Sequence, residues 1–192
     1  MALIRNLLAL IGLAVVVLAG YLYVSASGRL KDFDPEFVGV YKEFATRLLE
    51  TGDPGVSMMW AVPVKDGLSP TDVIESLKSL ASSRNMLFVG ESPFYKQVEA
   101  MTGQKYRYTN FLSFCSAQVG KLMLEYQDHY SGFMPCRIAL VENSKGKLWL
   151  YSMNLDLMIH GGKKLPPDLK EGALLVRKNM REMMEGAANG EF

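Results

Sequence analysis

The side chains best suited to chemistry lie in the segment SMNLDLMIH, which contains Met153, Met158 and His160. Thioether and imidazole groups are suitable ligands for Cu(I), and methionine–histidine pairs also hold haem iron. The spacing of these three residues matches no metal-binding motif, and both methionines fit equally well as core residues at the end of a strand. We interpret the segment as part of the hydrophobic core and keep a copper or haem site as the alternative.

Cys115 and Cys136 are the only thiols in the chain. Their separation excludes a local CxxC redox turn, and two thiols alone do not complete a structural zinc site. Outside the cytoplasm they would form a disulfide if their Cα atoms came within about 7 Å of each other. Buried, unpaired thiols are the preferred interpretation. A catalytic thiol has the least support, because no base is visible beside either cysteine.

Arg137 directly follows Pro135 and Cys136 at the start of a predicted strand. A guanidinium in that position either points to solvent or pairs with an anion. Asp156 and Glu142 are candidate partners for a structural ion pair, which is the preferred interpretation. A pocket in which Arg137 faces the anionic head group of a ligand is the alternative.

The sequence carries no recognisable catalytic motif, since it contains no nucleophile elbow, zinc-protease helix, phosphate-binding glycine loop or dinucleotide fingerprint. His129 follows Asp128, which could orient it as a base, but no further member of a catalytic triad can be named. Lysine and arginine number 21 and the acidic residues 20, so the chain lacks the basic excess of a nucleic-acid-binding protein. We expect neither enzymatic activity nor a nucleic-acid partner.

An uncharged run of 18 residues, Leu7–Val24, is long enough to cross the hydrocarbon layer of a membrane as a helix. A cleaved signal peptide is the alternative, because residues 24–26 resemble a cleavage site, but the run is longer than a typical signal core. We therefore predict an uncleaved anchor over residues 1–28 that crosses the inner membrane once. A short N-terminus followed by a long domain predicts that the domain lies outside the cytoplasm, in the periplasm.

Residues 29–55 predict an amphipathic stalk. Asp34 and Pro35 begin a helix whose apolar residues recur at three- and four-residue spacing as far as Thr51. The segment GDPG at residues 52–55 then ends it. The apolar side of this helix requires a partner, which predicts either a stalk or an element docked on the domain.

Residues 56–192 predict a single domain. A polar loop, Asn143–Gly146, separates two apolar runs and marks a β-hairpin, while Ser69, Ser92 and Ser116 stand where helices begin. The predicted strands are 56–64, 86–90, 106–115, 137–142 and 147–153, and the last predicted helix is 169–185. Strands joined partly by a hairpin and partly by helices indicate an α+β fold, with a mostly antiparallel sheet of about five strands and helices on one face.

The segment FLSFCS at residues 111–116, followed by a helix and by MPCRIALVE at 134–142, resembles the core signature of the domain of unknown function 302 family. The resemblance covers residues 56–185, and the step from a hydrophobic residue through Pro135 and Cys136 to Arg137 is its most specific element. The anchor and stalk resemble, more loosely, the extension of membrane-bound bacterial members. The resemblance implies a curved antiparallel sheet, similar in class to TATA-binding-protein-like folds, and a tendency to form dimers, but no activity.

These observations favour a membrane-tethered, periplasmic binding or accessory module without a cofactor. We expect it to contact a partner protein, as a homodimer or beside a membrane protein, or to hold a small apolar ligand between the sheet and the long C-terminal helix. The alternative is a periplasmic redox or metal protein that holds copper or haem through its Met, His and Cys side chains.

Overall fold

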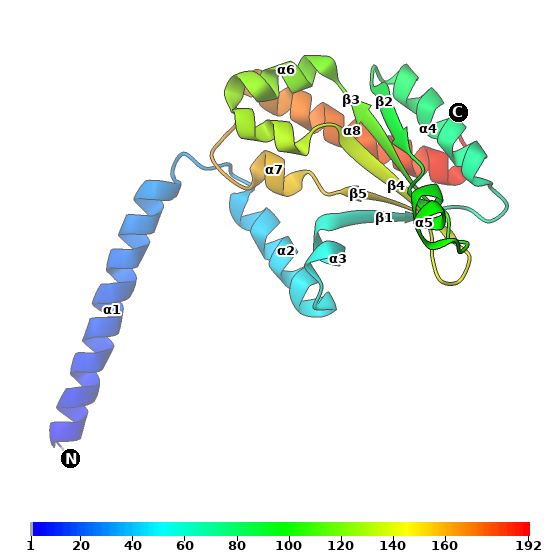
Figure 1. Ribbon diagram of the computed structural model, residues 1–192. Helices are drawn as coiled ribbons and strands as arrows, with labels where there is room; N and C mark the ends of the chain where they lie inside the picture. The colour runs from blue at the N-terminus through cyan, green and yellow to red at the C-terminus, as the bar shows by residue number, and fades with distance from the viewer. Residues whose placement is uncertain (1) are drawn as a thin grey trace.

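The polypeptide folds into helices and strands that together form an α+β structure, and the computed structural model describes residues 2–192. The helices are α1 (Ala2–Leu30), α2 (Phe37–Thr51), α3 (Pro54–Met58), α4 (Pro70–Ser83), α5 (Phe94–Thr102), α6 (Ala117–Tyr126), α7 (Asp156–His160) and α8 (Pro167–Asn189), with a 3-10 helix η1 (Asp128–Phe133). The strands are β1 (Met59–Pro63), β2 (Leu87–Ser92), β3 (Thr109–Cys115), β4 (Cys136–Glu142) and β5 (Leu148–Met153). The predicted fold class is confirmed (Figure 1).

The five strands form one antiparallel sheet in the order β1-β5-β4-β3-β2. β4 and β5 are the predicted hairpin, in which the Asn143 amide donates to the Lys147 carbonyl over 2.9 Å and Gly146 adopts a φ of 75°. Glycine takes this left-handed conformation at little cost, so Gly146 fixes the turn. Pro63 lies in the edge strand β1, where a proline is tolerated because one side of the strand has no neighbour.

The core lies on the side of the sheet where α8 packs, with α4 and α6 in turn contacting α8. Side chains alternate between the two faces along each strand, so Leu112, Ile138 and Leu150 all point to this side and are fully buried. Met180 and Met183 of α8 fill the space above them and are equally buried. Burying one side chain of this size contributes roughly 1.5–3 kcal/mol, so this layer supplies most of the stability.

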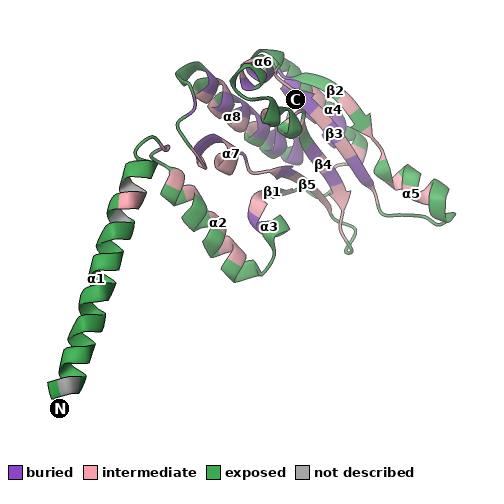
Figure 2. Cartoon of the chain, turned by 60° about the vertical axis from the view of Figure 1, so that its left-hand side comes forward, coloured by how far each residue is buried: buried purple, intermediate pink, exposed green. Residues whose placement is uncertain are grey.

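The opposite face of the sheet is bordered by helices at its edges. α5 contacts β3 on one side, and α3 contacts β1 on the other. Between them, the outward-facing residues of the central strands are half-buried, whereas their neighbours toward α8 are buried (Figure 2). This half-buried face is where the candidate site lies.

α1 projects away from the rest of the molecule (Figures 1 and 2). Its segment Ile4–Leu22 has a mean hydropathy of 2.0, and none of it is buried within the structure. At about 1.5 Å per residue its 19 residues extend about 28 Å, close to the thickness of a hydrocarbon layer. The helix is therefore long and apolar enough to cross a membrane.

Several predicted boundaries were wrong by a few residues. The first predicted strand is shorter, because Asp53 begins the short helix α3 by accepting the Gly55 amide on its Oδ1 over 2.7 Å. The stalk helix begins at Phe37. The last helix runs through Gly186 and ends at Gly190, whose φ of 78° provides the left-handed cap.

Candidate functional site

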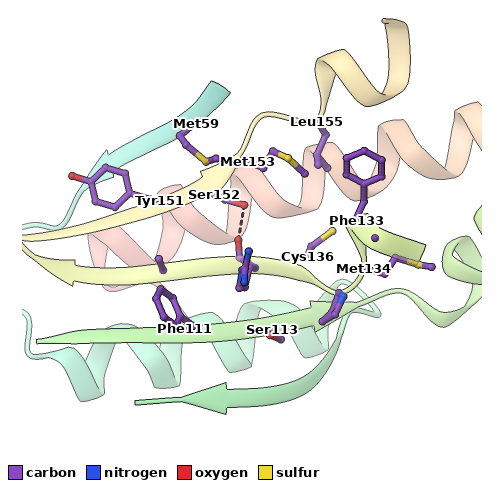
Figure 3. Close-up of a pocket in the computed structure, with 14 residues that line it drawn as sticks. Met59, Phe111, Ser113, Phe133, Met134, Cys136, Tyr151, Ser152, Met153 and Leu155 are labelled. Carbon is purple, nitrogen blue, oxygen red and sulfur yellow. Dashed lines mark hydrogen bonds between the residues drawn. The ribbon is translucent and has the colours of Figure 1, made fainter. Parts of the chain in front are cut away.

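The half-buried face of the sheet carries a pocket of about 640 Å³. Its walls come from β1, β3, β4 and β5 and from the segment that links η1 to β4 (Figure 3). Small-molecule sites in proteins usually measure about 300–1,000 Å³, so the pocket is large enough for a small ligand. The pocket lies on the face of the sheet opposite α8, whereas the sequence predicted a ligand between the sheet and the C-terminal helix, and that position stays a prediction.

The floor of the pocket is one row of cross-strand partners. Phe111 of β3, Ala139 of β4 and Tyr151 of β5 are paired in register and point to the same face. Ala139 leaves a hollow there because its methyl group stands between two large rings. Phe133 and Met134, which precede β4, add apolar walls, so most of the surface offered to a ligand is apolar.

Arg137 is the single charged side chain among the described residues that line the pocket. It is exposed, and its guanidinium has neither an ion-pair nor a hydrogen-bond partner within residues 2–192. The predicted pair with Asp156 is absent, because Asp156 Oδ1 lies 2.6 Å from Nε of Arg177. The other candidate, Glu142, accepts the Tyr108 amide over 3.1 Å. Arg137 is therefore available to an anion that enters the pocket.

The sulfur-bearing residues of the pocket come from separate strands. Met59 of β1 and Met153 of β5 are paired in register, and Met134 and Cys136 also line the cavity (Figure 3). Burial, with a smaller effect from Cys115, raises the pKa of the Cys136 thiol to about 11. Cys136 is therefore a neutral thiol near pH 7 and a poor nucleophile.

The two cysteines are free thiols at one end of the sheet. Cys136 is paired in register with Phe114, the residue before Cys115. Cys115 turns toward α6, where its Sγ lies near Gly120. A disulfide between Cys115 and Cys136 remains a prediction.

His160, the third residue of the predicted metal-binding set, is not among the residues that line the pocket and lies in a buried cluster. Its Nδ1 lies 3.0 Å from Oδ1 of Asp34, and Lys170 Nζ donates to Oδ2 of the same carboxylate. Met158 is on α7, the same helix as His160, and packs against the core. Met153 is therefore the one member of the set that lines the pocket. We refer to Asp34, His160 and Lys170 as the Asp34 cluster. The predicted ligand set is thus divided between two places.

The Asp34 cluster joins the segment after α1 to the loop between α7 and α8. Burial opposes ionisation of Asp34, but hydrogen bonds from Lys170, the Glu36 amide and His160 outweigh it and lower the pKa of Asp34 to about 2. The Asp34 amide also donates to the Gly162 carbonyl over 2.9 Å. Asp34 is therefore an ionised, buried anchor point for the linker.

His129, the other histidine considered, lies exposed in η1 with its Nδ1 3.1 Å from Nε2 of Gln127. Asp128 is not its hydrogen-bond partner in the part of the chain that the structure describes. One feature of the sequence does relate to the pocket. The aromatic residues Phe111 and Tyr151 occupy strand positions that alternate with the core positions. Apolar residues on both faces of a strand indicate that both faces are covered or occupied.

The chain is similar to a known protein family and to a solved structure. A model of the family described as domain of unknown function DUF302 matches residues 60–187. A crystal structure of an uncharacterized conserved DUF302 protein from Bacillus stearothermophilus is similar, with a TM-score of 0.54 and 17% sequence identity. The match covers 66% of this chain and 95% of that one, and at this identity it shows the fold alone. No curated protein matches the chain.

Proposed function

The chain belongs to the domain of unknown function DUF302 family, and because that family prescribes no activity, we propose from the chain's own geometry that it is a membrane-tethered ligand-binding module. Its ligand is small and mainly apolar and carries one acidic group. The observation that carries this proposal is an apolar pocket of about 640 Å³ in which Arg137 has no partner among the described residues.

The chemistry of the pocket favours an acid over a base or a neutral ligand. A guanidinium binds a carboxylate through two parallel hydrogen bonds, and the described lining holds no aspartate or glutamate to compete for it. The aromatic floor and the methionines remove the remaining apolar surface of the ligand from water. Ser113, which is opposite Arg137 in register, adds a hydroxyl to the same end of the pocket.

The tether gives this activity its location. With α1 across the inner membrane and the domain outside the cytoplasm, the pocket stays beside the bilayer, where amphiphilic acids and membrane proteins are concentrated. Protease digestion of spheroplasts tests this orientation. Cleavage of the domain in intact spheroplasts supports it, and protection until the membrane is lysed contradicts it.

The ligand proposal is tested by NMR on the full-length chain in nanodiscs, with ¹³C-labelled methionine methyl groups. The probe is 4-phenylbutyrate, and its neutral counterpart is 4-phenylbutyramide. We expect the acid to shift the signals of Met59, Met134 and Met153 while those of Met180 and Met183 stay in place. Equal shifts for acid and amide, or no shift of the pocket methionines, would contradict the proposal.

Filling the pocket provides the second arm of this test. Ala139→Trp places a large ring on the floor between Phe111 and Tyr151 and is expected to abolish the shifts. Ala61→Trp is the matched control, because Ala61 is the register partner of Tyr151 on the edge strand and lies outside the lining. A loss of binding in both variants would indicate general disruption of the sheet.

A second candidate function is the binding of a soft metal ion such as Cu(I). Four residues with sulfur-bearing side chains, Met59, Met134, Cys136 and Met153, line one pocket, and sulfur ligands select this ion. The high pKa of Cys136 favours the acidic ligand instead, because thiolate formation near neutral pH is costly. Adding Ag(I), a closed-shell substitute for Cu(I), to the same NMR sample separates the two candidates, because stoichiometric shifts of the pocket methionines would support the metal.

A further inference from the structure

The exposed side of α2 carries a lengthwise apolar stripe. Val38, Ala45 and Leu49 recur at spacings of seven and four residues and therefore lie on one stripe, which we call the outer apolar stripe. Lys42, one turn after Val38, lies beside the stripe, and Glu43 and Glu50 lie further round the exposed surface. The inner side of the helix, which contacts α3 and α7, is separate from both.

Leu49 is the least covered residue of this stripe. It is 87% exposed, the highest fraction among the large hydrophobic side chains whose burial the structure describes, and Val38 is 68% exposed. Val56, on α3 at the same end of α2, is 52% exposed. Apolar side chains gathered in this way on the surface of a folded domain mark a site of contact with another protein or with a membrane.

The geometry of α1 and α2 indicates which of the two this is. α2 starts beside the C-terminal end of α1 and runs back in the direction of the N-terminus of α1, diverging from it, in both views (Figures 1 and 2). From Leu22 to Leu30, α1 rises about 12 Å above its membrane-spanning segment, whereas the 15 residues of α2 extend about 22 Å. α2 is longer than this rise and runs back toward the bilayer, so its last turn comes down toward the level of the lipid head groups, which form a layer roughly 5–7 Å thick.

The linker prevents α2 from swinging away. The Phe33 amide donates to the Leu30 carbonyl, the Asp34 amide to Gly162 and the Lys164 amide to Asp32, at 2.9–3.0 Å. The Asp34 cluster ties the same segment to α7 and α8 through the buried Asp34 carboxylate. The direction in which α2 leaves α1 is therefore fixed by backbone and side-chain bonds.

We propose that the last turn of α2, where Leu49 ends the outer apolar stripe, contacts the head-group layer of the bilayer that α1 spans, with its apolar side toward the acyl chains. This inference rests on the membrane tether in the proposed function. It assigns the domain a second membrane contact, which holds the sheet at a set tilt. The proposed occupant is lipid, because α2 follows the membrane-spanning segment in the chain and runs back toward the end of that segment at Leu22.

Fluorescence quenching in nanodiscs tests the contact with the full-length chain. Leu49→Trp places a reporter on the stripe, and Met101→Trp is the matched control, because Met101 is a long side chain on α5 that is 80% exposed at the far side of the domain. Each variant is compared with the wild type, whose Trp60 and Trp149 provide the background. The quenchers are phosphatidylcholines brominated either near the head group or near the methyl end of the acyl chain.

We expect the tryptophan at position 49 to lose fluorescence in brominated lipid, most strongly with bromine near the head group, and the one at position 101 to lose none. No quenching at position 49, quenching at both positions, or cross-links from position 49 to a second copy would overturn the inference. A chain that fails to enter the nanodiscs would overturn the membrane tether and this inference together. Entry without quenching at position 49 would overturn this inference alone.

Discussion

Asp34 Oδ1 and His160 Nδ1 lie 3.0 Å apart, although 126 residues separate them in the chain. Lys170 completes the cluster from α8. The contact joins the segment that leaves the apolar helix to α7, which follows the last strand of the sheet. It therefore couples the stability of the domain to the position of the linker.

Replacing Asp34 by asparagine is expected to destabilise the domain at pH 7 by about 1–2 kcal/mol, a figure reduced for solvent screening because Lys170 is partly exposed. A carboxyl whose folded pKa lies below its unfolded value stabilises the fold above the unfolded pKa and loses that contribution as the pH falls. For Asp34 the loss falls between about pH 4 and pH 2. The difference between wild type and Asp34→Asn should therefore shrink in that window.

Urea unfolding of the full chain, followed by tryptophan fluorescence at pH 7 and at lower pH, measures this effect. Asp32→Asn is the control, because Asp32 is exposed and contributes only its backbone to the linker. A difference that stays constant from pH 7 to pH 2 would show that the carboxylate charge is not the cause.

Arg137→Gln is expected to weaken binding of 4-phenylbutyrate about tenfold to a hundredfold, as the loss of a hydrogen bond to a charged group. Affinity for the neutral amide should stay the same, because the apolar surface is unchanged. Titration of the pocket methionine signals measures both affinities. Arg107→Gln removes an equivalent exposed charge outside the pocket, and a similar loss in that variant would assign the effect to net charge.

Cys136 should react slowly with iodoacetamide. With its pKa raised from 9.0 to about 11, the thiolate fraction at pH 8 falls about a hundredfold. The variant Cys115→Ser isolates the Cys136 thiol, and mass spectrometry follows its alkylation. In urea the rate should rise to that of an ordinary thiol, and a folded-state rate equal to the unfolded one would refute the effect of burial.

Gly161→Ala should destabilise the domain by roughly 1–3 kcal/mol, as overpacking against rigid atoms does. An added Cβ would overlap the backbone carbonyl of Leu157, which cannot move without breaking the last turn of α7. The neighbouring substitution Gly162→Ala is the control, because nothing lies within 4 Å of the added Cβ there. Thermal unfolding of both variants measures the difference, and equal melting temperatures would contradict it.

Local patterns predicted most of the fold. Ser69, where a helix was predicted to begin, forms a capping box with Asp72, and Ser116 accepts the Val119 amide at the start of α6. These features depend on residues three positions apart, so the sequence displays them directly. The same holds for the hairpin around Gly146 and for the apolar helix α1.

The site was less accessible to prediction because it depends on contacts between distant segments. Asp156 pairs with Arg177 of α8 instead of Arg137, and this choice follows from the packing of α8 against the end of β5 and α7. His160 pairs with Asp34, which lies 126 residues earlier in the chain. Spacing along a sequence carries no information on such partners. The alternation of Phe111 and Tyr151 with core residues is the one local signal of a second apolar face, and it was missed in the prediction from sequence.

The Phe33 amide donates to the Leu30 carbonyl and the Asp34 amide to the Gly162 carbonyl, so hydrogen bonds tie the end of α1 to the loop between α7 and α8. Tilting of the apolar helix in the membrane is then expected to tilt the pocket in the same direction. A membrane protein that binds α1 within the bilayer would thereby change the orientation of the pocket without contacting the domain.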